Sequence, residues 1–338
     1  MKQKNIRRLA LFAFLGLFAS FSYSQTKWAQ TGFTFLEISS DARAAAIGDA
    51  VNSLSGYTGA LFHNPATMAD IPVLFNSSFS VNTWIADIQH VEFSMMLSPF
   101  SGDYGVIGVS VQSVDYGDFI GTMVWPSDQG FIDTEIMNPS ALVFGVGYAK
   151  MISEQFGVGG QVKFAYQELG KSVVADGNSF ITKQNVADAV AYDFGTIFKT
   201  GVRGIAFGMS VRNFSKEIKY EEEGFQLPLL FTMGISTNMF EFAEMEVQDQ
   251  KLMLSVDATH PRSHPEQIKV GIEYSFMNSL SLRGGYTSGN SEDAFSYGLG
   301  FSTAGLGVDT FGNLEVDYAY TPFGIFDNVQ RFTVRYSL

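Results

Sequence analysis

The chain has 338 residues, with 34 Asp and Glu against 21 Lys and Arg, and it contains no cysteine. The missing cysteines exclude disulfide scaffolds, cysteine-ligated metal sites and cysteine nucleophiles, and the net charge of −13 argues against nucleic acid as a partner. Aromatic residues reach 14%, whereas charged residues supply only 16%, below the roughly one quarter that is usual in soluble domains. This composition indicates many strands and a large apolar surface.

Residues 1–24 have the pattern of a cleaved secretory signal peptide. A head with four basic residues precedes the apolar stretch 9–21, and the small residues Ser22 and Ser24 stand just before the expected cleavage point. The apolar stretch is too short to remain as a spanning helix. We therefore expect an exported protein, either soluble outside the cytoplasm or inserted in an outer membrane as a β-barrel.

Residues 25–72 show no regular alternation of polar and apolar residues. The alanine-rich stretch 41–50 predicts a short helix, and Asn64–Pro65 predicts a turn, because proline holds the residue before it in an extended conformation. A segment of mostly small and apolar residues ahead of a barrel is suited to fold inward as a hatch. We expect Arg43 in this hatch to pair with a carboxylate in the lumen. The candidate partners are Asp193, Asp257 and Asp317.

From residue 140 onward the chain alternates with a period of two, and less regular segments of the same kind lie between residues 73 and 113. In 156–167, for example, Phe164 belongs to the apolar face, and in 267–276, Gly271 belongs to the small and polar face. The expected strands lie near 73–81, 89–98, 104–113, 142–150, 156–167, 190–199, 204–213, 229–237, 251–259, 267–276, 279–287, 295–302, 313–320 and 331–338. Their lengths, roughly 8–12 residues, are sufficient to cross a bilayer with tilt.

The two faces of these strands decide between a soluble sandwich and a membrane barrel. The polar face is rich in Gly, Ser and Ala, which suits a crowded lumen, and the apolar face is unusually aromatic, as expected next to lipid. We therefore predict an all-β fold: a transmembrane antiparallel β-barrel of about fourteen strands over 73–338, preceded by the hatch. A secreted sandwich is the alternative. Substituting Phe164 with arginine should impair insertion, whereas Gly271 should tolerate serine.

The connections alternate in length, as they do in outer-membrane barrels. Long links at 114–139, 168–188 and 214–227 are expected to be external loops, and the link 239–250 is too long for a simple turn on the other side. The run 217–223 is acidic and predicts a solvated loop. The loop 114–139 is too apolar for a loop that is merely solvated, and we expect it to contact a protein partner. Its candidate contact residues are Phe119, Trp125, Phe131 and Ile132.

Three stretches of the hatch carry a resemblance to a known family. Residues 35–38 (FLEI), 41–48 (DARAAAIG) and 64–66 (NPA), followed by some fourteen strands, resemble the PorV/PorQ family of outer-membrane proteins. That family is similar to FadL-type fatty-acid channels, which have a fourteen-stranded barrel, an N-terminal hatch and an NPA-type motif. The resemblance implies a role in type IX protein secretion. The hatch motif comprises Arg43, Asn64, Pro65 and Ala66.

The sequence offers no catalytic constellation. It contains no nucleophile elbow, phosphate loop or dinucleotide fingerprint. His260 and His264 have a spacing that can bind a metal on a helix, but Pro261 and Pro265 disfavour a helix there. His63, in the hatch, is interpreted as structural. We therefore expect no enzymatic activity, no cofactor and no metal.

Two functions remain open. The leading hypothesis is a non-enzymatic outer-membrane component of protein secretion, a cargo shuttle or part of an attachment complex, whose partners are a secretion translocon, secreted cargo proteins and outer-membrane lipid. The alternative is a FadL-like channel that carries a hydrophobic small molecule in its lumen. An apolar external loop favours the first, and an apolar pocket near the hatch would favour the second.

Overall fold

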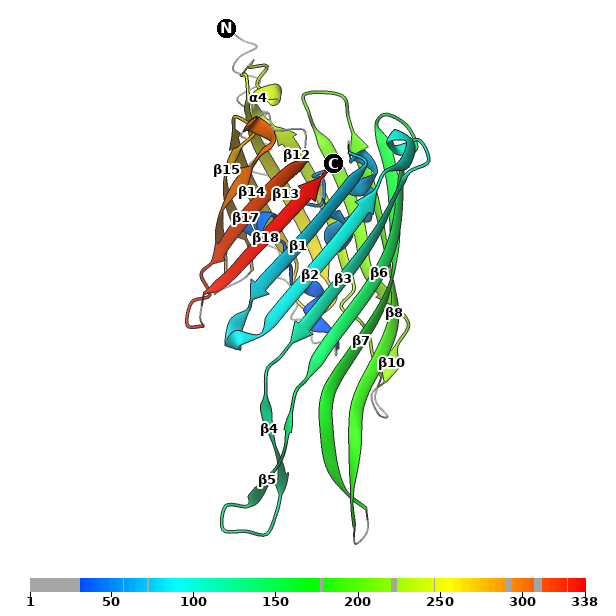
Figure 1. The fold of residues 1–338 in the computed structure, drawn as a ribbon, viewed down its shortest axis with the longest axis vertical. Coiled ribbons are helices and arrows are strands. Elements are labelled where there is room, and N and C mark those ends of the chain that lie inside the picture. Colours follow the sequence, from blue (N-terminus) through cyan, green and yellow to red (C-terminus); the bar gives the residue numbers. More distant parts are fainter. Residues whose placement is uncertain are drawn as a thin grey trace.

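The computed structural model describes residues 31–338, except 57, 72, 177–178, 220–223, 246, 290–292, 307–311 and 327. The predicted signal peptide and part of the acidic run 217–223 therefore lie outside the described residues. Fourteen antiparallel strands form a closed barrel in which β1 pairs with both β2 and β18 (Figure 1). The predicted fold class is confirmed.

The barrel strands follow one another around the wall in chain order. They are β1 (Phe75–Thr83), β2 (Gln89–Leu97), β3 (Val106–Asp115), β6 (Ser140–Met151), β7 (Phe156–Asp176), β8 (Ser179–Lys199), β9 (Ala206–Ser215), β12 (Leu230–Asn238), β13 (Gln250–Pro261), β14 (Gln267–Phe276), β15 (Leu280–Thr287), β16 (Phe295–Ser302), β17 (Asn313–Thr321) and β18 (Val329–Ser337). The short helices in the links are η3 (Ile85–Asp87), η4 (Pro99–Gly102), α4 (Met239–Phe242) and η5 (Ala304–Leu306).

Successive side chains of each strand point alternately outward and into the lumen. On β7, Phe164 is 49% exposed on the outside, whereas its neighbours Lys163 and Ala165 are buried inside. The same pattern leaves large apolar side chains exposed around the whole wall, and such a band is stable only against lipid. Among the described residues, no helix is long and apolar enough to cross a bilayer.

Both ends of the barrel sequence lie at the same end of the barrel. Backbone hydrogen bonds of 3.0 and 2.9 Å join Phe75 and Leu338 there, and we call it the terminal end. An even number of strands returns both ends of the barrel sequence to one side, and in outer-membrane barrels that side, with the short turns, faces the periplasm. We call the opposite end, which carries the long connections, the hairpin end. The link 239–249, which departs from the rule of short periplasmic turns, begins with α4, whose first turn is capped by Asn238.

Two of the expected external loops are instead β-hairpins that project beyond the barrel (Figure 1). The link 114–139 folds into β4 (Phe119–Val124) and β5 (Phe131–Met137), a separate two-stranded sheet. The link 168–188 is absorbed by β7 and β8, which continue to pair beyond a register shift at Glu168–Lys171. The third, 214–227, contains the short pair β10 (Ile218–Lys219) and β11 (Gly224–Phe225).

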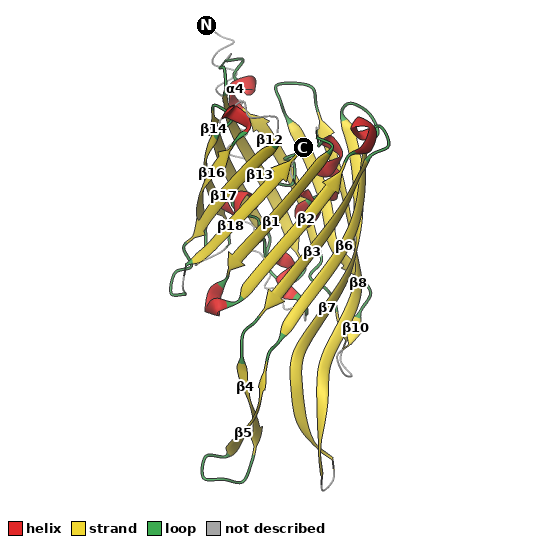
Figure 2. Ribbon diagram, viewed as in Figure 1, coloured by secondary structure: helices red, strands yellow, loops and turns green. Residues whose placement is uncertain are grey.

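The hatch residues from 31 to 71 lie within the barrel, where Figure 2 shows short helices surrounded by the strands of the wall. The helices are η1 (Thr34–Glu37), α2 (Ala42–Ala46), α3 (Ala60–His63) and η2 (Pro65–Asp70). They pack directly on glycines of the wall: a Cβ added to Gly271 would lie 2.6 Å from the Ile47 carbonyl oxygen. The expectation that Gly271 tolerates serine is therefore wrong, because the lumen at that position is filled by backbone of the hatch.

Candidate functional site

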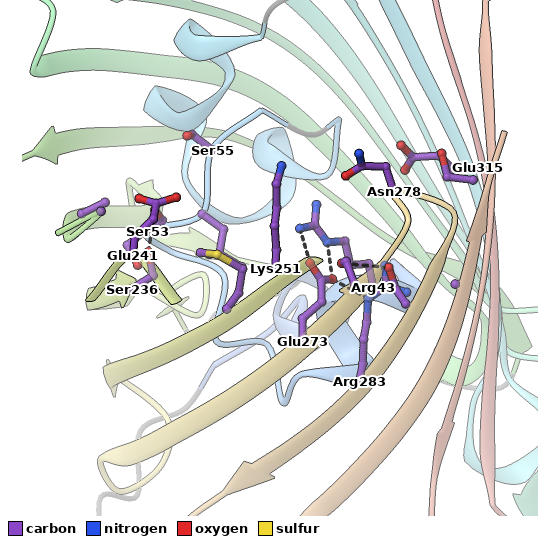
Figure 3. Close-up of a pocket in the computed structure, with 18 of the residues that line it drawn as sticks. Arg43, Ser53, Ser55, Ser236, Glu241, Lys251, Glu273, Asn278, Arg283 and Glu315 are labelled. Carbon is purple, nitrogen blue, oxygen red and sulfur yellow. Dashed lines mark hydrogen bonds and ion pairs between the residues drawn. The ribbon is translucent and has the colours of Figure 1, made fainter. Parts of the chain in front are cut away.

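Buried ion pairs attach the hatch to the barrel wall. Arg43 forms a bidentate pair with Glu273 of β14, with two hydrogen bonds of 2.8 Å (Figure 3). Glu273 also accepts a hydrogen bond of 2.5 Å from Arg283, which stands opposite it on β15. The expectation of a lumen carboxylate is met, but its three candidates were the wrong ones. Glu273 is the partner of Arg43 because its position on β14 points it at Arg43 of α2 and places it opposite Arg283 on β15.

A second contact extends the same network to β17 and β18. Asp41 caps α2 by accepting a hydrogen bond from the backbone nitrogen of Ala44, at 2.8 Å, and pairs with Arg335 at 2.5 Å. Arg335 and Arg283 both pair with Asp317. Burial alone would raise the pKa of Asp41, but the charge of Arg335 and the cap hydrogen bond hold it below its ordinary value. Three arginines thus neutralise three buried carboxylates, and we call this set the hatch lock: Asp41, Arg43, Glu273, Arg283, Asp317 and Arg335.

The NPA sequence forms the turn between α3 and η2. The Asn64 side-chain amide donates to the carbonyls of Asn52, at 2.8 Å, and Thr196, at 3.1 Å, and its oxygen accepts from the Ala66 nitrogen, at 3.1 Å. Pro65 begins η2, where its missing N–H leaves no unsatisfied donor. Ala66 is fully buried, and its backbone lies against Gly159 of β7. The motif therefore ties the hatch to itself and to β8.

The histidines have partners that agree with structural roles. His260 contacts Glu266 at 3.0 Å, and His264 contacts Glu37 at 3.1 Å, so the two histidines face different carboxylates. Burial, together with the nearby charge of Arg212, lowers the pKa of His63 to about 4. Across the described residues, no group of three His, Cys, Asp or Glu side chains could hold a metal ion.

Two chambers lie in the lumen, and the hatch borders both of them. A chamber of about 1010 Å³ opens toward the terminal end and is lined by Arg43, Lys199 and Glu241 among others. A vestibule of about 580 Å³ lies toward the hairpin end and is lined by Trp84, Lys269 and Arg331 among others. The hatch contributes residues to both linings. The hatch therefore lies between the two chambers.

An apolar cluster lies beside the vestibule, and it was not anticipated from the sequence. Phe33 and Phe35, at the start of the hatch, are 1% and 2% exposed and pack with Leu36 against the inner wall. The wall contributes Val114, Ala141, Val143, Ala165, Ala187, Ala189, Ala191 and Leu227. Phe33 and Phe35 fill the space between these wall residues, so the set is a packed cluster, and we call it the apolar pocket in that filled sense. Its sequence signal was the run of valine and alanine at inward positions of β3, β6, β7 and β8, where other strands carry polar residues.

The predicted partner-contact residues are on the surface of the β4–β5 hairpin. Phe119 is 50% exposed, and Trp125, Phe131 and Ile132 are between 36% and 44% exposed. Other large side chains of the hairpin, Ile120, Val124 and Ile136, are more exposed still. The hairpin is thus an apolar projection outside the barrel, away from the hatch.

No family profile matches the sequence, and no curated protein matches it. The fold is similar to that of the toluene transporter TodX from Pseudomonas putida, with 12% identity, a TM-score of 0.55, and 93% of this chain and 99% of that chain covered. The toluene transporter TbuX from Ralstonia pickettii gives 10% identity, a TM-score of 0.56 and coverage of 87% and 96%. A FadL homologue from Pseudomonas aeruginosa gives 11%, 0.54, and 93% and 100%. At these identities the likeness shows the fold alone.

Proposed function

We propose that the chain is a gated outer-membrane channel for small hydrophobic molecules, the alternative raised by the sequence. The structures that share its fold include two toluene transporters and a FadL homologue, which favours this function over the secretion role implied by the PorV/PorQ resemblance. The apolar pocket is the observation that carries the proposal. An apolar solute needs apolar side chains inside the barrel in order to leave water, and this cluster supplies them.

The pocket is occupied by the chain itself. The rings of Phe33 and Phe35 lie 5.9 Å apart, and Phe33 stacks on Phe225 at 6.2 Å. Phe33 has a φ of 58°, a left-handed conformation that costs a bulky residue energy and that the surrounding packing must maintain. An apolar solute of similar size would regain the same contacts if residues 31–38 withdrew. Segment 31–38 is therefore proposed as the gate.

Replacing Phe35 with alanine is expected to speed the entry of an apolar solute by at least about three-fold, because removing a buried Phe ring weakens the packing of the gate. The measurement is the uptake of the apolar dye N-phenyl-1-naphthylamine by intact cells that carry the protein in their outer membrane. The matched control is Phe164→Ala, which removes the same ring from the lipid face. The polar substrate nitrocefin reports any general leak.

Dye entry that is no faster with Phe35→Ala than with Phe164→Ala would contradict the proposal. So would an equal rise in nitrocefin entry, because it would indicate a hole rather than an apolar path.

A protein partner is the second candidate, and the β4–β5 hairpin supports it. Residues 116–139 contain four acidic and no basic residues, which gives a net charge of −4. These charges lie in the same hairpin as the exposed apolar side chains. The negative charge disfavours insertion into an anionic lipid surface and favours a protein with a basic and apolar face. The secretion translocon and cargo expected from the sequence remain candidates for such a partner.

Deleting residues 119–137 is expected to leave barrel assembly unchanged, because β4 and β5 form a sheet of their own and the barrel ladder β3–β6 already ends at Asp115 and Ser140. The same deletion should abolish association with a secretion partner, since its aromatic side chains would be the anchors of the interface. Heat-modifiable migration measures assembly, and secretion of cargo measures association. Normal secretion without the hairpin would remove the second candidate and leave dye uptake as the test of the first.

A further inference from the structure

Three side chains join the gate to the external rim of the barrel. Glu37, the last residue of η1, receives Ser263 Oγ at 3.1 Å on one carboxylate oxygen and His264 Nε2 at 3.1 Å on the other. Ser263 Oγ and His264 Nδ1 are 2.7 Å apart, so the three groups form a closed triangle. Ser263 and His264 belong to the link between β13 and β14 at the hairpin end. We call this triangle the mouth latch.

The number of hydrogens decides when the mouth latch is complete. Three contacts between donors and acceptors need three hydrogens. The Ser263 hydroxyl has one, a neutral imidazole has one and a carboxylate has none, which gives two. With an additional proton on His264, Nδ1–H donates to Ser263 Oγ, the hydroxyl donates to Glu37, and Nε2–H donates to the other Glu37 oxygen. All three contacts are then satisfied at the same time, and Glu37 and His264 form an ion pair.

We propose that the mouth latch is a proton-controlled lock on the gate, complete when His264 is protonated and one hydrogen short when it is neutral. Histidine is the side chain whose charge ordinarily changes between about pH 5 and pH 8. His264 is 44% exposed and Glu37 only 14%, so protons reach the latch from the external medium while its carboxylate is largely shielded. The latch should therefore hold the gate more tightly in acid and release it as the pH rises.

Other charged groups lie near the latch and determine the electrostatic potential at His264 and Glu37. Those lining the same vestibule come from the hatch and from three elements of the wall: Asp49, Lys269, Asp293 and Arg331. Glu37 also borders a small cavity with His63, Arg212 and Asp257. On the link itself, Arg262 and Glu266 flank the latch, and Glu266 contacts His260. His264 is the titratable group that contacts the gate directly, which makes it the one to substitute.

Gate opening can be measured without any solute, because the chain has no cysteine. A single cysteine introduced by Leu36→Cys, at a position 7% exposed in the apolar pocket, reacts with a maleimide only when segment 31–38 withdraws. At about pH 5.5, adding His264→Gln should accelerate labelling about 2- to 10-fold, the effect of losing one or two hydrogen bonds. At about pH 8, where the neutral imidazole has one hydrogen fewer to donate, the acceleration should be smaller than at about pH 5.5. Comparison at one pH cancels the pH dependence of the thiol itself.

His260→Gln is the matched control, because His260 lies on the same rim and pairs with Glu266 of the same link. It should leave labelling unchanged at both pH values. Equal labelling with and without His264→Gln at about pH 5.5, or the same acceleration from His260→Gln, would overturn the mouth latch.

The role of the latch in solute entry rests on the proposed channel function, and dye uptake separates the two. Uptake that rises with pH in the unsubstituted protein and loses this dependence in His264→Gln supports both. Labelling that depends on His264 without any dye uptake would retain the latch and reject the channel. Dye uptake with no effect of His264→Gln on labelling would reject the latch and retain the channel.

Discussion

Replacing Glu273 with glutamine is expected to release the hatch from the barrel wall. The substitution removes the charge that Arg43 and Arg283 share, so that Arg43 loses its bidentate carboxylate and Arg283 keeps only Asp317. Removing one partner from a buried ion pair costs about 3–5 kcal/mol, because the remaining charge has lost both water and its counter-ion. The wall itself should persist, since its strands are joined by backbone hydrogen bonds. The expected result is an assembled barrel with a far larger ion conductance.

The measurement is single-channel conductance in a planar bilayer, with heat-modifiable migration as the check on assembly. Glu244→Gln is the matched control: it removes the carboxylate from the pair Arg203–Glu244, which lies exposed at the terminal end with a separation of 2.7 Å. An exposed pair contributes only about 0–1 kcal/mol, so this variant should stay closed. Equal and low conductance of both variants would show that the hatch lock does not hold the hatch.

Replacing Gly159 with valine is expected to have an effect of similar size by a steric route. A Cβ at this position would lie 2.7 Å from the backbone nitrogen of Ala66, and backbone cannot turn aside as a side chain can. Overpacking commonly lowers the free energy of unfolding by about 1–3 kcal/mol. Here η2 would have to move away from β6, β7 and β8, against which it packs. We expect a folded barrel with a displaced hatch, seen as increased conductance and increased entry of nitrocefin.

The adjacent glycine provides the control. Gly160 points to the lipid face, where an added Cβ would meet its nearest neighbour, the Asp193 carbonyl oxygen, at 3.4 Å. Gly160→Val should therefore assemble and remain closed. A closed Gly159→Val channel would mean that the hatch adapts to the added volume, whereas leakage from Gly160→Val would indicate damage to the wall instead of loss of the seat.

The membrane barrel could be predicted from the sequence because its cause is local. Each wall residue faces either lipid or lumen, so the sequence of a strand must alternate with period two. On β7 the apolar Phe164 faces the lipid and its charged neighbour Lys163 faces the lumen. The hatch could also be predicted from the sequence, since residues 25–72 lack that alternation. The projecting hairpins were read as loops because solvent on both faces of a strand removes the alternation that marks a strand. Only the pairing of β4 with β5 and of β7 with β8 revealed them.

The partners inside the lumen depended on closure of the barrel. Arg43 is separated from Glu273 by 230 residues, and Glu37 from Ser263 by 226, so no spacing in the sequence relates them. Strand register and the fit of α2 against the wall decide which carboxylate each arginine meets. The glycines at 159 and 271 likewise look interchangeable with other small lumen residues until the hatch backbone is seen against them. The sequence alone determined which face each residue occupies, whereas the tertiary structure decided what lies opposite it, because contacts across a lumen join residues from distant parts of the chain.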